Sequence, residues 1–196
     1  TSEKQKPFID PETQVLGDIL LFKVPVKNLS CFENLFCEEE NIFEMRSAFY
    51  NDFRVSVPQM INEVNLKNKA IKKGTDVQVS REDFALLLES YREFSKEGIP
   101  YFLFGHFGDR HLHFNFTPKL KEEVLQVEEL LTEFYKGLTK LKVSPFAEHG
   151  IGIVKYQFVK HFWGANQMKM FKFLKEKFDP QNKFFPMGYM GKIINE

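Results

Sequence analysis

The clearest periodic segments of the chain lie in its middle, where apolar positions recur at helical spacing. Residues 80–98 begin with Ser80, carry acidic side chains in the first turn and end at Gly98. This pattern predicts a helix that Ser80 caps at its start and Gly98 terminates. A longer amphipathic helix is predicted over residues 119–142. Its expected apolar face comprises Leu120, Val124, Val127, Leu131, Phe134, Leu138 and Leu141.

The segment between these helices has the pattern of a β-hairpin. Residues 99–106 form an apolar run that indicates a buried strand. Residues 111–117 alternate in polarity and indicate its antiparallel partner. The sequence FGDR at residues 107–110 supplies the polar turn between them.

The hairpin predicts that three histidines share one face of the sheet. A four-residue connection pairs His106 with His111 and Phe104 with His113, and paired residues point to the same side. Because side chains alternate along a strand, Phe114 and its apolar neighbours lie on the opposite side. We expect the apolar side to meet the helices, and the histidine side to be the open face of the sheet.

The remaining elements are predicted from shorter patterns, and together they indicate an α+β fold, an antiparallel sheet with helices packed on one face. Residues 1–16 are polar and indicate a loose lead-in or linker, and residues 17–196 a single domain. The other predicted elements are strands over 18–25, 52–58 and 75–79, helices over 33–49, 152–162 and 165–178, and a basic loop over 62–74.

Composition narrows the choice of partners. Among 196 residues, Lys+Arg and Asp+Glu balance at 27 each, so charge favours neither nucleic acid nor an anionic membrane. No apolar run approaches the roughly 20 residues of a membrane helix, and we expect a cytoplasmic protein. The 23 phenylalanines predict an aromatic core, in which we place Trp163 and the stripe Phe171, Phe173 and Phe178.

The histidine cluster suggests metal chemistry. Imidazoles on neighbouring strand positions chelate zinc, iron or manganese when another ligand is available. The sequence AEHG offers Glu148, followed by His149 and a glycine corner. Surface histidines that bind nothing are the alternative, and the residues alone leave both interpretations open. A histidine-triad or HxH hydrolase is a weaker hypothesis, because Asn115 stands where the triad needs its third histidine.

Three spaced motifs resemble the C-terminal cap domain of FAD-linked oxidases of the vanillyl-alcohol-oxidase type, such as glycolate oxidase, D-lactate dehydrogenase and D-2-hydroxyglutarate dehydrogenase. The family pattern G-H-x-G-D-G-N-x-H corresponds to residues 105–113, which read GHFGDRHLH. E-H-G-x-G corresponds to residues 148–152, and D-P-x-x-x-x-N-P-G to residues 179–188. Residues 44–49 resemble the arginine segment of the family, and residues 74–84 its strand-to-helix junction.

The resemblance implies a ferredoxin-like cap domain and a role for each motif. His106, His113 and Glu148 would hold a divalent metal that grips the hydroxyl and carboxylate of a small 2-hydroxy acid. His149 would be the base that takes the hydroxyl proton, and Arg46 would bind the substrate carboxylate. FAD would accept the hydride.

No glycine-rich phosphate loop occurs in this sequence, whose 11 glycines are scattered. We therefore expect FAD to be held mainly by an N-terminal FAD-binding domain that this chain lacks, and the chain alone to be inactive. A homo-oligomer is compatible with this expectation. Departures from the family pattern at Arg110, His111 and Phe185 motivate the alternative of a degenerate, non-catalytic cap that acts as a docking module.

Overall fold

The structure is a computed structural model that describes residues 20, 21, 23 and 46–188. The chain divides into two compact units, residues 1–64 and 65–196. Most of the strand predicted over residues 18–25 and most of the helix predicted over 33–49 lie outside the described residues. Among the described residues, no helix combines the length and apolar character that crossing a membrane requires.

The first described helix, α2 (Ser47–Asn68), corrects two predictions. Residues 52–58 were predicted as a strand that stops at Pro58, and residues 62–68 as part of a loop, yet both lie inside this helix. Phe53 and Ile61 are eight residues apart and both buried, which is the spacing of one helical face. The local alternation of DFRVSVP resembles a strand pattern, and the longer helical period outweighs it.

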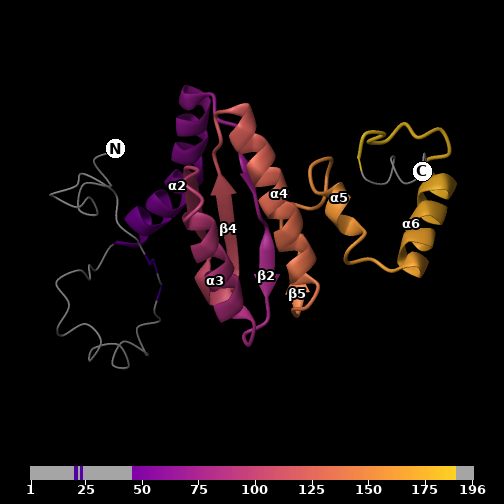
Figure 1. Cartoon of the computed structure of the whole chain (residues 1–196), viewed down its shortest axis with the longest axis horizontal. Helices are drawn as coiled ribbons and strands as arrows, with labels where there is room; N and C mark the ends of the chain where they lie inside the picture. Colours follow the sequence, from indigo (N-terminus) through magenta and orange to yellow (C-terminus); the bar gives the residue numbers. More distant parts are fainter. Residues whose placement is uncertain (1–19, 22, 24–45, 189–196) are drawn as a thin grey trace. The chain divides into compact units, whose positions relative to one another are not determined.

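The second unit is built on an antiparallel sheet with β4 (His111–Phe116) at its centre (Figure 1). β3 (Tyr101–His106) pairs with one edge of β4. Two short strands, β1 (Lys73–Gly74) and β2 (Val77–Val79), pair with the other edge, and β5 (Val143–Ser144) pairs with β2. The predicted register is confirmed, since His106 pairs with His111 and Phe104 with His113.

Helices α3 (Phe84–Ser95) and α4 (Lys121–Leu138) cover one face of this sheet (Figure 1). The predicted α+β class is therefore confirmed. Helix α3 begins later than predicted, because Ser80 and Asp83 close a separate turn through the Asp83 amide and the Ser80 hydroxyl. The core joins β4 to both helices and includes Leu87, Tyr91, Phe94, Leu112, Phe114, Phe116, Val127, Leu131, Phe134, Tyr135 and Leu138.

Two expectations about burial are wrong. Strand β3 is an edge strand whose Tyr101 and Leu103 side chains are exposed, whereas all six residues of β4 are buried. The aromatic stripe is also not core, because Phe173 is 60% exposed and Phe178 is 79% exposed. Both belong to α6 (Ala165–Phe178), which follows the short helix α5 (Tyr156–Val159) and has no buried residue.

A buried hydroxyl network links α3 to the sheet, and it yields a first prediction. The Tyr91 hydroxyl lies 2.7 Å from Thr75 Oγ1 and donates to the Leu112 carbonyl at 3.2 Å. Tyr91→Phe would remove one buried hydrogen-bond partner from Thr75 Oγ1 and one from the Leu112 carbonyl. The substitution is expected to lower the free energy of unfolding by about 1–2 kcal/mol. Denaturant unfolding of the full chain measures this cost. Tyr101→Phe, at an exposed tyrosine, is the matched control, and an equal loss in both variants would contradict the prediction.

Candidate active site

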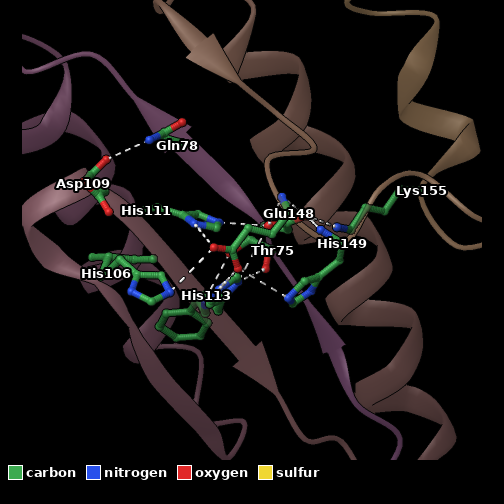
Figure 2. Close-up of polar contacts among 12 residues, drawn as sticks. Thr75, Gln78, His106, Asp109, His111, His113, Glu148, His149 and Lys155 are labelled. Atoms are coloured by element: carbon green, nitrogen blue, oxygen red, sulfur yellow. Dashed lines mark hydrogen bonds and ion pairs between the residues drawn. The ribbon is translucent and has the colours of Figure 1, made fainter. Parts of the chain in front are cut away.

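The Glu148 carboxylate lies at the centre of a ring of imidazoles (Figure 2). Its Oε1 atom is 3.5 Å from His111 Nδ1 and 3.6 Å from His106 Nε2. Its Oε2 atom is 3.8 Å from His113 Nε2 and 4.0 Å from His149 Nε2. Four histidines of the second unit therefore converge on one carboxylate.

The hairpin places three of these histidines, and its glycine and turn explain how. Gly105 pairs with Leu112, and a Cβ atom there would lie 2.4 Å from the His111 carbonyl oxygen, so only glycine allows this close pairing beside His106. The turn η3 (Phe107–Asp109) then ends at Arg110. Arg110 has φ 57° and ψ 33°, the left-handed conformation for which the family pattern has glycine. Its guanidinium donates to the Val79 carbonyl at 3.3 Å, which supports this conformation.

Asp76, on the segment that leads into β2, holds Glu148 and His149 in place. Its side chain is fully buried. The carboxylate accepts the His149 amide at 2.8 Å, the Glu148 amide at 3.2 Å and the Lys155 ammonium at 3.0 Å. Burial works against the charged carboxylate, but the hydrogen bonds from the His149 amide, Lys155 and His111 outweigh it, so the pKa of Asp76 lies well below its usual value. Asp76 is therefore an anion that ties the EHG loop to the sheet.

The two buried histidines are each held by an acceptor on the side away from Glu148. His111 Nε2 lies 2.9 Å from Asp76 Oδ1, and His113 Nδ1 lies 3.4 Å from the Thr75 carbonyl oxygen. The His113 ring also stacks on His149 at 4.8 Å between centroids. Burial lowers the pKa of His113 to about 4, and the neighbouring His111 and His149 add to this shift. His113 is thus neutral at neutral pH, the form that binds metals.

The structure brings together four of the five residues singled out from the sequence: His106, His113, Glu148 and His149. The expectation that the histidine face is open is wrong, because His111 and His113 are only 3% and 4% exposed. Residues 147–155 contribute the Glu148 carboxylate and the His149 ring to this face. Arg46 is exposed and lies in the first unit, so its role stays a prediction.

Asp76, Thr75 and Lys155 belong to the site but were not predicted from the sequence. The sequence does contain a sign that Asp76 has a partner. This acidic residue stands directly before the alternating valines of the predicted strand TDVQV, and a charge buried with such a strand is costly unless it is paired. Lys155 closes the segment EHGIGIVK and is its only basic side chain besides the histidine. The residues around Asp76 and around Lys155 do not show that the two are partners, because they lie far apart in the sequence.

The donor set fits a divalent metal ion. Among the described residues, two overlapping groups have ligand atoms within 4.8 Å of one another: His111, His113 and Glu148, and Asp76, His113 and His149. Imidazole nitrogen with carboxylate oxygen is the donor combination that zinc, iron and manganese accept. The site therefore combines possible ligands with an adjacent imidazole, His149, that can accept a proton.

Comparison with known proteins agrees with this geometry. Residues 35–187 match the family described as FAD linked oxidases, C-terminal domain. The chain belongs to this family. Membership confirms the resemblance drawn from the three motifs and argues against the histidine-triad and HxH hydrolase hypotheses.

Three curated relatives are similar to parts of this chain. The chain is 33% identical over 88 residues to a putative mitochondrial D-lactate dehydrogenase of Schizosaccharomyces pombe, covering 44% of this chain and 16% of the relative. It is 29% identical over 120 residues to a glycolate oxidase subunit of Bacillus subtilis, covering 60% of this chain and 26% of the relative. It is 32% identical over 88 residues to a D-2-hydroxyglutarate–pyruvate transhydrogenase of Saccharomyces cerevisiae, covering 44% of this chain and 17% of the relative. The matches thus span about a quarter or less of each relative.

Proposed function

We propose that this chain is the substrate domain of an FAD-dependent oxidoreductase that oxidises a small 2-hydroxy acid of the lactate, glycolate or 2-hydroxyglutarate type. The observation that carries the proposal is the convergence of His106, His111 and His113 on Glu148, with His149 beside them. The names of the three relatives, all concerned with 2-hydroxy acids, support the substrate class.

Each residue has a definite task in this proposal. His106, His113 and Glu148 would hold a divalent ion, which would supply a positive charge to polarise the substrate hydroxyl and neutralise its carboxylate. His149 Nε2 accepts the hydroxyl proton, because its ring lies against His113 and its Nε2 atom faces Glu148. Arg46 binds the substrate carboxylate through a charge-assisted hydrogen bond.

FAD does not fit this chain by itself, because the sequence has no glycine-rich loop to hold a pyrophosphate. We infer that an N-terminal FAD-binding domain of the same protein holds the cofactor and is the principal partner of this domain. FAD held there would supply the hydride acceptor. The cytoplasmic location and the homo-oligomer stay predictions.

Replacing His149 by glutamine tests its role as the base. His149→Gln keeps a polar side chain but removes the proton acceptor, and kcat is expected to fall about 10²–10⁴-fold. Metal content should not change, because His149 is not one of the proposed ligands. Steady-state kinetics and elemental analysis of the protein from its own cells measure both quantities. A variant that retains metal and full kcat would exclude His149 as the base.

The proposal as a whole is tested by a substrate panel. The protein, purified from its own cells with its flavin, is assayed with both enantiomers of lactate and of 2-hydroxyglutarate, and with glycolate. Oxidation of at least one of these acids is the expected result. A flavin-loaded protein that oxidises none of them, in any metal-loaded form, would contradict the proposal.

A non-catalytic docking module is the second candidate. The exposed apolar side chains Met170, Phe173 and Phe178 of α6 favour it, together with Phe184 and Phe185 just beyond. This candidate requires that the native protein binds neither a divalent ion nor a hydroxy acid. Stoichiometric metal in the purified protein would exclude it.

A further inference from the structure

We propose that His111 is a fourth protein ligand of the divalent ion, so that the site offers three imidazoles and one carboxylate. This inference rests on the proposed function, from which it takes the ion itself. The ligand set implied by the family resemblance contains only His106, His113 and Glu148. His111 stands where the family pattern has asparagine, so the fourth ligand would be a property of this chain.

The hydrogen bonds of His111 prepare it for this role. Its Nε2 atom lies 2.9 Å from Asp76 Oδ1, and an ionised carboxylate only accepts hydrogen bonds. In the neutral ring the proton then sits on Nε2, which leaves the lone pair on Nδ1. That Nδ1 atom faces Glu148 Oε1 at 3.5 Å. A carboxylate that fixes the tautomer of a ligating histidine is the usual outer partner in metal sites.

His113 is prepared in the same way. Its Nδ1 atom faces the Thr75 carbonyl, another pure acceptor, at 3.4 Å, so the proton sits on Nδ1. The lone pair on Nε2 then faces Glu148 Oε2 at 3.8 Å. In their neutral forms, the two buried imidazoles present their lone pairs to the oxygens of one carboxylate. A cation bound among the three groups would give each of these acceptors a partner.

The spacing of the donor atoms agrees with a shared ion. Two ligand atoms bound at about 2.1 Å to one ion lie roughly 3.0–3.4 Å apart in octahedral or tetrahedral geometry. The three separations from Glu148 to His106, His111 and His113 are 3.6, 3.5 and 3.8 Å. These separations are slightly longer than a shared ion requires, and His106 belongs to neither of the two groups whose ligand atoms lie within 4.8 Å of one another, so binding an ion would require the side chains, His106 above all, to move closer.

The alternative group of Asp76, His113 and His149 is a poorer metal site. Asp76 already accepts hydrogen bonds from two backbone amides and from His111. The Lys155 ammonium lies 3.0 Å from its Oδ2 atom and would repel a second cation. Asp76 is therefore a positioning residue for His111 and the EHG loop.

Four protein ligands change which metal suits the reaction. A 2-hydroxy acid that chelates through its hydroxyl and carboxylate oxygens needs two free positions, which makes six in total. Iron(II) and manganese(II) accept six ligands readily, whereas zinc with four protein ligands is a closed structural site. We therefore expect the native ion to be one that favours octahedral coordination.

Counting the bound imidazoles in the wild-type protein tests the proposal without a substitution. The full-length flavin-loaded protein is stripped of metal, reloaded with Co²⁺ and examined by proton NMR. Each coordinated imidazole contributes one exchangeable N–H signal that the paramagnetic ion shifts far downfield. Three such signals are expected, from His106, His111 and His113. Two signals would contradict the four-ligand set, and the persistence of both in His111→Asn would overturn the role of His111 while leaving the proposed function intact.

Affinity measurements on matched variants complete the test. His111→Asn is expected to raise the Kd for Co²⁺ at least about tenfold, as the loss of a ligand requires. His161→Asn, at a histidine outside the site, should leave the Kd unchanged. An unchanged Kd in His111→Asn, together with a large loss in His113→Ala, would also overturn the fourth ligand. A wild-type protein that binds no Co²⁺ would contradict both this inference and the metal-assisted function.

Discussion

Glu148→Gln is expected to remove the divalent ion and lower kcat/KM for the hydroxy acid about 10³-fold or more, as the loss of several kcal/mol of transition-state stabilisation requires. Glu148 is the residue that every histidine of the cluster approaches, and it is the one carboxylate among the proposed ligands. Elemental analysis gives the metal content, and steady-state kinetics of the full-length protein give kcat/KM.

Glu122→Gln is the matched control for this substitution. Glu122 is an exposed glutamate in the first turn of α4, so the control changes the same charge outside the site. It should leave the metal content and kcat/KM as they are in the wild type. If Glu148→Gln kept stoichiometric metal and wild-type kcat/KM, Glu148 would not be a ligand.

Asp76→Asn is expected to have the largest effect on stability. The substitution removes the counter-charge of Lys155, whose side chain is 12% exposed, and places an amide donor where the carboxylate accepted hydrogen bonds. Breaking a buried ion pair by removing one partner costs about 3–5 kcal/mol of unfolding free energy. Denaturant unfolding of the full chain measures the loss. The EHG loop should also become more susceptible to proteolysis, because its Glu148 and His149 amides lose their acceptor.

A double-mutant cycle separates the orphaned charge from other effects of this substitution. Lys155→Met removes the buried ammonium and keeps an apolar side chain of similar length. The pair Asp76→Asn, Lys155→Met should therefore recover part of the stability that Asp76→Asn loses. If the two losses simply added, the ion pair would not be the cause.

The parts of the fold set by short-range patterns were predicted from the sequence. The FGDR connection and the alternation of HLHFNF fixed the hairpin register, because strand pairing follows from turn length and a period of two. Helix α4 followed from its long apolar stripe. These features depend on neighbours in the sequence, so one sequence sufficed.

The parts set by distant segments were not predicted. The histidine face of β4 was predicted to be open, because its partners, Glu148 and His149, come from a loop that follows α4. Asp76 lies in the segment predicted as a strand over residues 75–79, and only the fold shows that it holds that loop. Helix α2 was missed because DFRVSVP alternates locally, and the burial of Phe53 and Ile61 reveals the helical period only over a longer stretch.

The central claim is that this site uses a divalent ion to oxidise a 2-hydroxy acid. Its most direct test follows the flavin absorbance of the full-length protein under anaerobic conditions after mixing with the best acid of the substrate panel. The metal-loaded protein should bleach its flavin rapidly, the chelator-stripped protein should not, and restored metal should restore the rate. Equally fast flavin reduction in the stripped and loaded proteins would contradict the account.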